Sequence, residues 1–266
     1  MSGSGNDFIL IDHREPFLKE GRLKDFIRKV CRRRVSVGAD GLILIEPSQK
    51  ADFKWRFYNS DGSEAEMCGN GGRCAARFAN LRGIAGPSLK FETLAGILSA
   101  QIDGKNVKLE MTKPSGLKLD ETIFVDGEKQ IFSTINTGVP HAVLFVEDLE
   151  GVDIVPVGRA IRFHSNFAPG GTNVNFIRLG KGSQLSIRTY ERGVEDETLA
   201  CGTGAVAVAL VAAFKGLVKS PVSIKTRGGE VLKVYFEIEA KEAKRVFFEG
   251  DVHIIYEAEM WEEAFQ

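Results

Sequence analysis

The stretch Cys68-Gly69-Asn70-Gly71-Gly72-Arg73 returns half a chain later as Cys201-Gly202-Thr203-Gly204-Ala205, with its cysteine 133 residues further on. The same offset relates four further pairs of residues: Gly5 and Gly138, Gly83 and Gly216, Thr93 and Thr226, and Gly96 and Gly229. Internal similarity of this length indicates two domains built alike. A pseudo-two-fold axis relating them would direct both thiols to a single point.

The composition is that of an ordinary globular protein, with 43% hydrophobic and 27% charged residues in a chain of 266. A formal net charge of −1 argues against nucleic acids and anionic membranes as partners. The longest apolar run, residues 205–214, is too short to cross a bilayer. There is no export-signal pattern, and four cysteines are too few for a disulfide framework. We therefore expect a cytoplasmic protein with free thiols.

Hydrophobic patterns and turn residues predict an α+β fold. We expect strands over residues 8–11, 42–46, 53–58, 89–93, 97–102 and 107–111, and again over 131–136, 142–146, 174–179, 185–190, 222–226, 231–237 and 246–257. Residues 22–31 read as a helix, and a helix follows each cysteine turn, over 73–82 and 204–214. The repeat predicts two pseudo-symmetric domains, 1–114 and 115–266, with the last strand or tail packing back on the first half.

The two helices after the cysteine turns differ in polarity. The second, residues 205–214, is apolar on every face and is therefore expected to be buried all round, with a twisted sheet or barrel wrapped around it. The first contains Arg73, Arg77 and Asn80, so we expect one of its faces to meet solvent or the other domain.

A cysteine followed by Gly-X-Gly at the start of a helix has a chemical logic. The first N–H groups of a helix lack helical acceptors, and the helix dipole favours negative charge there, so a thiol is stabilised as its thiolate. The glycines allow a ligand to approach the backbone, whose N–H groups can bind a carboxylate. Each half therefore offers a reactive thiol and an anion-binding turn, at Cys68-Gly69-Asn70 and Cys201-Gly202-Thr203.

The other two cysteines are assigned to the core. Cys31 ends a predicted helix, and Cys74 lies inside the helix that follows Cys68. The six-residue spacing of Cys68 and Cys74 does not suit a metal pair, and no second pair or nearby histidine completes a zinc site. We expect no metal.

The residues carry a resemblance to the diaminopimelate epimerase family, which is independent of pyridoxal phosphate and has two catalytic cysteines. The matching segments follow the family order over nearly the whole length: Gly5-Asn6-Asp7-Phe8, Tyr58-Asn59-Ser60-Asp61-Gly62-Ser63, Met67 to Cys74, Gly138-Val139-Pro140-His141, Thr172-Asn173-Val174-Asn175-Phe176, Tyr190-Glu191-Arg192-Gly193 and Ala200 to Gly204. The resemblance implies that LL- and meso-diaminopimelate are interconverted, without a cofactor, in lysine and peptidoglycan-precursor synthesis. It also implies a small amino-acid substrate and a homodimer.

The resemblance implies a role for each matched residue. Cys68 and Cys201 are the two bases, and His141 and Glu191 support catalysis. The residues expected around the substrate are Asn6, Asn59, Gly69, Asn70, Asn173, Glu191, Arg192, Gly202 and Thr203. Arg192 suits a distal carboxylate and Glu191 an ammonium group. Turn roles for Asn59 and Asn173, a surface pair for Glu191 and Arg192, and a structural role for His141 stay open alternatives.

Two positions depart from the family pattern. Val139 stands where many members have asparagine, so one polar contact is lost or comes from nearby Asn136, and Gly41 stands where some members have glutamine. A racemase of proline, hydroxyproline or histidine would share the two thiols, although Asn70 and the Glu191-Arg192 pair favour the diaminopimelate type. A thiol redox switch lacks its usual Cys-X-X-Cys spacing, and a non-catalytic binding protein is the third alternative.

Overall fold

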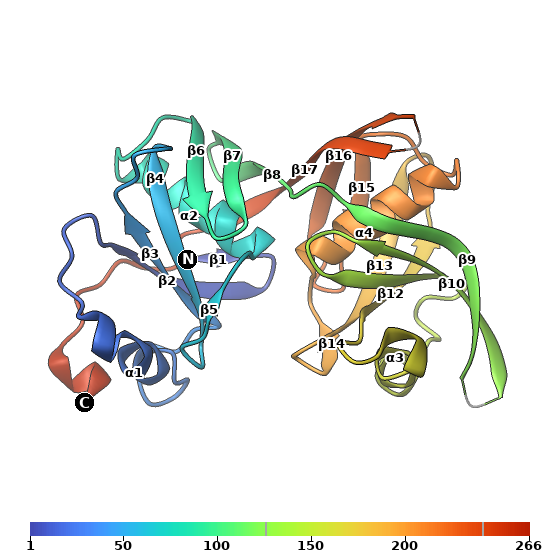
Figure 1. The fold of residues 1–266 in the computed structure, drawn as a ribbon, viewed down its shortest axis with the longest axis horizontal. Helices are drawn as coiled ribbons and strands as arrows, with labels where there is room; N and C mark the ends of the chain where they lie inside the picture. Colours follow the sequence, from blue (N-terminus) through green and yellow to red (C-terminus); the bar gives the residue numbers. More distant parts are fainter. Residues whose placement is uncertain (126, 241) are drawn as a thin grey trace. The chain divides into compact units, whose positions relative to one another are not determined.

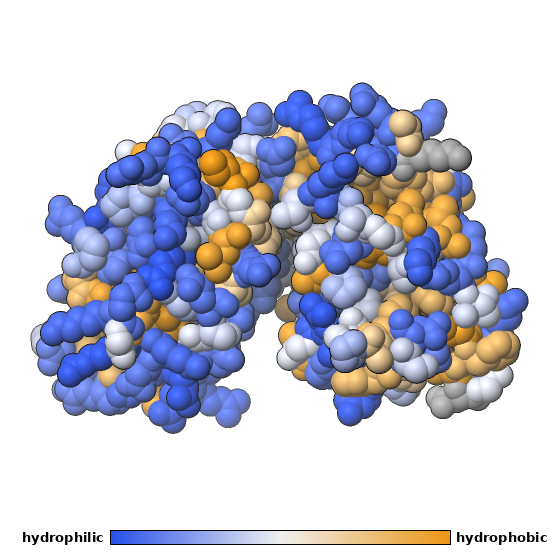
Figure 2. Space-filling view, in the orientation of Figure 1, coloured by the Kyte–Doolittle hydropathy of each residue, from blue (hydrophilic) through white to orange (hydrophobic). Residues whose placement is uncertain are grey.

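The computed structural model describes residues 1–125, 127–240 and 242–266. Its contacts divide the chain into two units, one made of Met1–Glu110 with Gly250–Gln266 and the other of Met111–Glu249. None of the described helices is both long and apolar enough to cross a membrane. In the view of Figure 2, hydrophilic side chains cover most of the face of the first unit, and hydrophobic and hydrophilic side chains are mixed on that of the second.

The first unit is a closed sheet around one helix, α2. Its elements are β1 (Ser2–Gly3), β2 (Asn6–Asp12), α1 (Glu20–Val30), β3 (Gly41–Glu46), β4 (Phe53–Asn59), β5 (Glu64–Ala65), α2 (Gly69–Leu81), β6 (Ser88–Thr93), β7 (Gly96–Asp103), β8 (Asn106–Glu110) and the 3-10 helix η2 (Glu262–Phe265). The strands pair in the order β1-β2-β3-β4-β6-β7-β8, and the end of β17 joins β8 to β1. Helix α2 contacts β1, β2, β3, β7 and β8 (Figure 1).

The second unit repeats this order of elements. It contains β9 (Ser115–Val125), β10 (Glu128–Asn136), β11 (Pro140–Phe145), α3 (Ile154–Arg162), η1 (Ser165–Phe167), β12 (Asn173–Leu179), β13 (Gln184–Glu191), β14 (Asp196–Thr198), α4 (Gly202–Phe214), β15 (Val222–Lys225), β16 (Val231–Glu239) and β17 (Glu242–His253). Parallel pairs β11–β12 and β13–β15 match β2–β3 and β4–β6. Helix α4 contacts β10, β11, β12, β13, β15 and β16, so the prediction of pseudo-symmetric sheets around central helices is confirmed.

The two central helices begin and end in the same way. Cys68 and Cys201 are the N-cap residues of α2 and α4, so the helices start earlier than predicted, directly after each cysteine. Each ends at a glycine with positive φ, Gly83 at 65° and Gly216 at 74°. The N–H of the residue after that glycine reaches back five positions to Ala79 or Ala212, which is a Schellman end.

The prediction that one face of α2 meets solvent or the other domain is wrong for Arg73, which is fully buried inside the first unit. Arg77 and Asn80, named with it, are half-buried. Its guanidinium group donates to the Asp251 carbonyl at 3.1 Å, to Asn70 Oδ1 at 3.0 Å and to the Ser4 hydroxyl. These hydrogen bonds from its two terminal nitrogens offset the cost of burying the guanidinium group.

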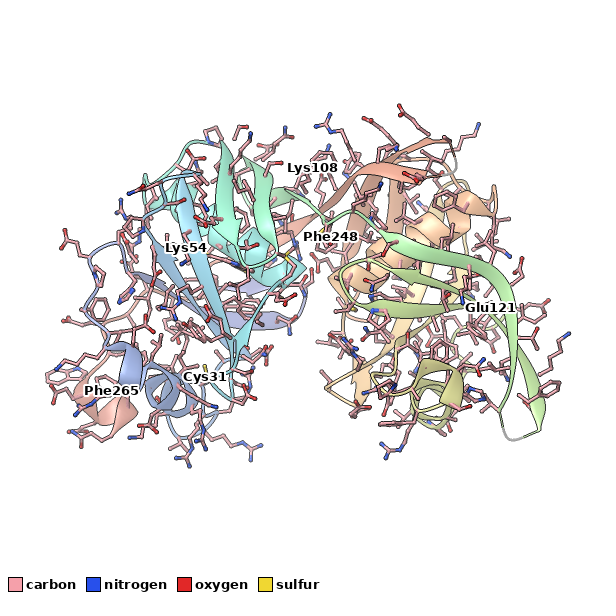
Figure 3. The ribbon with its side chains drawn as sticks, in the orientation of Figure 1. Cys31, Lys54, Lys108, Glu121, Phe248 and Phe265 are labelled. Carbon is pink, nitrogen blue, oxygen red and sulfur yellow. The ribbon has the colours of Figure 1, made fainter. Side chains whose placement is uncertain are left out.

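The structure also contains elements that the sequence did not predict. They are helix α3, strand β9, the small strands β1, β5 and β14, and the 3-10 helices η1 and η2. The connection predicted over residues 112–116 runs into β9 at Ser115, and β17 ends at His253 instead of residue 257. The C-terminal residues return to α1, where the Phe265 and Phe26 rings meet edge to face at 5.2 Å (Figure 3).

Candidate active site

The two catalytic candidates occupy equivalent places, each at the N-cap of a buried helix. Cys68 is half-buried, and its Sγ accepts a hydrogen bond from the Gly71 N–H at 3.4 Å. Cys201 is 7% exposed, and its Sγ lies 3.5 Å from Thr203 Oγ1. Both residues have extended backbone, so each side chain stands at the mouth of its helix, where the first-turn N–H groups favour negative charge.

The second glycine of each turn lies against the sheet of its own unit. A Cβ on Gly204 would stand 2.6 Å from Asn175 Oδ1 and 3.3 Å from Cys201 Sγ, so no side chain fits there without movement. A Cβ on Gly71 would meet Ile43 Cδ1 at 3.3 Å and Cys68 Cβ at 3.5 Å. The close approach of the turn to the sheet thus explains why position 204 requires glycine, whereas the requirement at position 71 is weaker.

In the first unit the predicted ligands Asn6 and Asn70 belong to one chain of hydrogen bonds. Asn70 Nδ2 donates to Asn6 Oδ1 at 2.8 Å, and Asn6 Nδ2 donates to Asp40 Oδ2 at 2.9 Å. Because Asn70 Oδ1 also accepts from Arg73, the Asn70 side chain is held by protein groups and is only 4% exposed. At the N-terminus of α2, Asn70 therefore presents its backbone N–H to a ligand.

The outer end of this chain is an ion-pair cluster. Arg33 donates to Asp7 Oδ2 at 3.0 Å and to Asp40 Oδ1 at 2.8 Å. Although burial acts in the opposite direction, the Arg33 guanidinium holds the pKa of the Asp7 carboxyl below its usual value. Asp40 joins the two groups, because its Oδ2 accepts from Asn6 and its Oδ1 from Arg33, a role that the sequence did not predict.

The candidate Asn59 and its strand partner Gly41 have mainly structural contacts. Asn59 is exposed, and its Nδ2 donates to Ser63 Oγ at 3.1 Å within the turn between β4 and β5, as the alternative turn role predicts. Gly41 pairs with Asn59, and a Cβ at Gly41 would stand 2.5 Å from the Tyr58 carbonyl oxygen. The glutamine of other family members does not fit this backbone.

In the second unit Asn173 and the Glu191-Arg192 pair meet at the ends of β12 and β13. Asn173 is 4% exposed, donates to the Pro140 carbonyl at 3.1 Å and accepts from the Arg192 N–H at 2.9 Å. Glu191 Oε2 accepts from Thr198 Oγ1 at 2.8 Å, and Arg192 Nη1 donates to the Gly170 carbonyl at 3.4 Å. The half-buried Glu191 and Arg192 are thus held by contacts within their own unit.

His141 lies at the start of β11 and is 1% exposed. Its Nδ1 lies 3.1 Å from Asn175 Nδ2. Burial, with a smaller contribution from the Arg192 charge, lowers the pKa of His141 to about 3. The imidazole is therefore neutral at physiological pH, which removes it as an acid with a pKa near 7.

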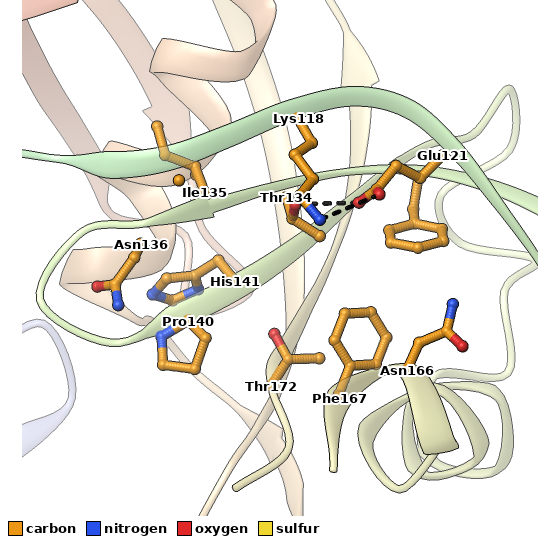
Figure 4. Close-up of a pocket in the computed structure, with 12 residues that line it drawn as sticks. Lys118, Glu121, Thr134, Ile135, Asn136, Pro140, His141, Asn166, Phe167 and Thr172 are labelled. Atoms are coloured by element: carbon orange, nitrogen blue, oxygen red, sulfur yellow. Dashed lines mark hydrogen bonds and ion pairs between the residues drawn. The ribbon is translucent and has the colours of Figure 1, made fainter.

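A cavity of about 330 Å³ opens beside His141 within the second unit. Figure 4 shows its walls, which include Asn136, Pro140 and Thr172 near His141, and Phe167 on the opposite side. Asn136 Oδ1 accepts from the Gly138 N–H at 2.9 Å, so Asn136 caps the turn before Val139. The side-chain NH2 of Asn136 takes no part in this bond, so Asn136 keeps donors for the contact expected to replace the one lost at Val139.

The remaining cysteines have the character of core residues. Burial raises the pKa of Cys31 to about 11 and that of Cys74 to about 12, so both stay protonated and unreactive. Cys31 lies at the end of α1 (Figure 3). Across the described residues, no group of three or more histidine, cysteine, aspartate or glutamate side chains is arranged for a metal ion.

Comparison with solved structures agrees with the fold. The chain superposes with a TM-score of 0.71 on a phenazine biosynthesis PhzF-family protein of Bacillus anthracis, at 17% identity, covering 94% of this chain and 92% of the other. It superposes with a TM-score of 0.70 on a hydroxyproline epimerase of Agrobacterium vitis, also at 17% identity, covering 94% and 87%. At these identities the likeness shows the fold alone.

Sequence comparison is more specific. A model of the family described as diaminopimelate epimerase matches residues 1–117 and 133–255. The diaminopimelate epimerase of Aquifex aeolicus (strain VF5) is 53% identical over 277 aligned residues, covering 100% of this chain and 98% of the relative. That of Archaeoglobus fulgidus is 47% identical, covering 88% and 87%. With matches that run through both cysteine turns, this chain belongs to the diaminopimelate epimerase family.

Proposed function

We propose that this protein interconverts LL- and meso-diaminopimelate by moving the α-proton between two cysteine side chains, without a cofactor. The observation that carries the proposal is the equivalent placement of Cys68 and Cys201 at the mouths of two buried helices in a member of this family. Inverting a tetrahedral carbon requires one base on each face, one deprotonated and one protonated. Two thiols that exchange these states with the direction of reaction meet that need.

The first-turn N–H groups supply the second part of the chemistry. Removal of the α-proton sends charge into the α-carboxylate, and donors fixed before the reaction stabilise that charge at no cost in reorganisation. The backbone N–H groups of Gly69, Asn70, Gly202 and Thr203 are the donors we assign to this task, because the first turn of a helix has no helical acceptors for them.

The side chains around the turns select the substrate. In the proposed complex the Arg192 guanidinium pairs with the distal carboxylate and the Glu191 carboxylate with an ammonium group. Asn6, Asn59 and Asn173 contribute polar contacts through the hydrogen-bonding positions that their protein partners leave open. We also assign to Glu191, which accepts a hydrogen bond from Thr198, a supporting role in catalysis. We further propose a homodimer that works in the cytoplasm, in lysine and peptidoglycan-precursor synthesis.

Proton NMR in heavy water tests the reaction. With LL-diaminopimelate and enzyme, the α-proton signal should disappear and the signals of the meso isomer should grow. Proline, hydroxyproline and histidine serve as control substrates, because a racemase of those amino acids would share the two thiols. Loss of the α-proton from one of these controls, with diaminopimelate untouched, would replace the proposal by the alternative reaction.

A further inference from the structure

Three polar side chains form a buried cluster in the sheet of the second unit. His141, Asn175 and Thr189 lie on the adjacent strands β11, β12 and β13 and are 1%, 0% and 2% exposed. Thr189 Oγ1 lies 3.1 Å from Asn175 Oδ1, and Asn175 Nδ2 lies 3.1 Å from His141 Nδ1. The cluster reaches the mouth of α4, since only the absence of a Cβ at Gly204 lets Asn175 Oδ1 lie there.

The first unit shows that the fold does not require this polarity. In matching strand registers, Phe8 and Gly41 correspond to His141 and Asn173, which places Ile43 where Asn175 stands and Phe57 where Thr189 stands. All three counterparts of the polar cluster are apolar, and the Phe8 and Phe57 rings pack edge to face at 5.9 Å. Packing of the sheet therefore does not explain why this cluster is polar.

The hydrogen bonds of Asn175 decide which nitrogen of His141 carries the proton. The Ala142 carbonyl can only accept, so the Asn175 atom 3.0 Å away from it is the amide nitrogen. The second N–H of that amide then points at His141 Nδ1, which must be a bare acceptor. A neutral imidazole with bare Nδ1 has its proton on Nε2.

The Nε2–H group of His141 has no acceptor among the described residues and is itself buried. A buried donor left without a partner costs about 1–3 kcal/mol, and a role in catalysis is one of the explanations for such a group. Resting on the proposed function, we infer that Asn175 is a positioning residue that locks His141 as the Nε2–H tautomer. His141 then acts as a fixed hydrogen-bond donor to an anionic group of the reaction and does not itself exchange protons.

Nitrogen-15 NMR of the imidazole rings tests the tautomer without any substrate. The chain has four histidines, and the His141→Gln variant identifies the signal that belongs to His141. At pH 7 we expect an Nε2–H pattern in the wild-type protein and in Thr189→Val, which leaves the bond between Asn175 and His141 intact. Asn175→Asp, whose carboxylate can only accept, should move the proton to Nδ1 or charge the ring. A wild-type Nδ1–H or imidazolium pattern, or an unchanged pattern in Asn175→Asp, overturns the inference.

Steady-state rates of α-proton exchange test the donor role. His141→Gln keeps an N–H near the position of Nε2, whereas His141→Leu removes it, so kcat should fall about 10²–10³-fold more in His141→Leu than in His141→Gln, with KM changing far less. Equal rates in the two variants overturn the donor role. Failure of the proposed function would appear separately, as no α-proton loss in the wild-type protein, while the imidazole spectra still report the tautomer.

Discussion

Helices α2 and α4 occupy the same place in their units, but the buried residues of the two helices differ in polarity. At α4 the helix is apolar on every face, and Val206, which matches Arg73 in the repeat, is fully buried. At α2 the buried Arg73 donates hydrogen bonds to Ser4, Asn70 and the carbonyl of Asp251. The sheets show the reverse, because the polar cluster of Asn175 lies in the second unit and its counterparts in the first are apolar. The two halves thus share their helix caps, turns and strand order, but their buried polar side chains lie at different positions.

The largest expected effect comes from removing either thiol. Cys68→Ala and Cys201→Ala should each lower epimerisation by about 10²–10⁴-fold or more, because each removes one of two acid–base groups. Exchange measured by proton NMR in heavy water, starting from the LL and the meso isomer separately, should show complementary defects, since the remaining thiol faces only one side of the α-carbon.

Cys31→Ala is the matched control for these variants. It removes a buried thiol at the end of α1 and should change turnover less than about threefold, with a modest loss of stability. If Cys68→Ala and Cys201→Ala lose the same exchange from the same isomer, the two turns do not serve opposite faces, and their functional equivalence fails.

A smaller effect is expected from Arg73→Met, which keeps the apolar stem and removes the guanidinium group. The acceptors on Ser4, Asn70 and Asp251 would lose a charged donor, so the free energy of unfolding should fall by about 3 kcal/mol in urea titrations. Because Asn70 and Asn6 would lose their orientation, KM should also rise. Val206→Ala, at the matching position in α4, should cost about 2 kcal/mol and leave KM unchanged. An unchanged KM in Arg73→Met would limit Arg73 to a purely structural role.

The sequence was sufficient for the architecture and for placing Cys68 and Cys201 at the starts of the central helices, because those depend on local signals. Glycine after a helix, a cysteine at its start and alternating hydrophobic strands are read from neighbouring residues, and the repeat at 133 supplies the pairing of domains. Helix α3 was missed because its nine residues, with a proline in the first turn, resemble a loop.

Long-range polar contacts could not be predicted in this way. Arg73 looked like a surface residue because arginine rarely lies fully buried, and its partners Ser4 and Asp251 are far away in the sequence. Asn175 was visible in the matched segment, but its function depends on a strand register that brings it to His141 and to the close approach at Gly204. The roles given to Asn59, Asn173, Glu191 and Arg192 stay predictions.

The glycines of the two turns give the next contrast. Gly204→Ala should lower the free energy of unfolding by about 2 kcal/mol, since its Cβ would displace Asn175 Oδ1 from 2.6 Å. In Gly71→Ala the one tight contact of the new Cβ is with the end of the Ile43 side chain, at 3.3 Å, and its contact with Cys68 Cβ at 3.5 Å is an ordinary one. Because alanine also gains helix propensity of about 1 kcal/mol, the net change should be near zero. Urea unfolding of both variants measures the difference. A Gly71→Ala variant as unstable as Gly204→Ala would show that the turn itself requires both glycines.

The last contrast concerns the pH dependence of stability that His141 contributes, which has no counterpart in the first unit. The folded protein holds the pKa of His141 near 3, whereas an unfolded chain has the ordinary value of about 6.5. Between these values the unfolded state binds the extra proton, so stability falls as the pH falls, by about 1.4 kcal/mol for each unit below pH 6.5. The slope vanishes above pH 6.5, where both states are neutral.

His141→Gln should remove this slope while leaving the slopes from carboxylates in place, as urea titrations at pH 7, 6 and 5 would reveal. Phe8, the counterpart of His141 in the first unit, does not titrate. If the wild-type protein and His141→Gln lose the same amount of stability between pH 7 and pH 5, His141 reaches water before the protein unfolds.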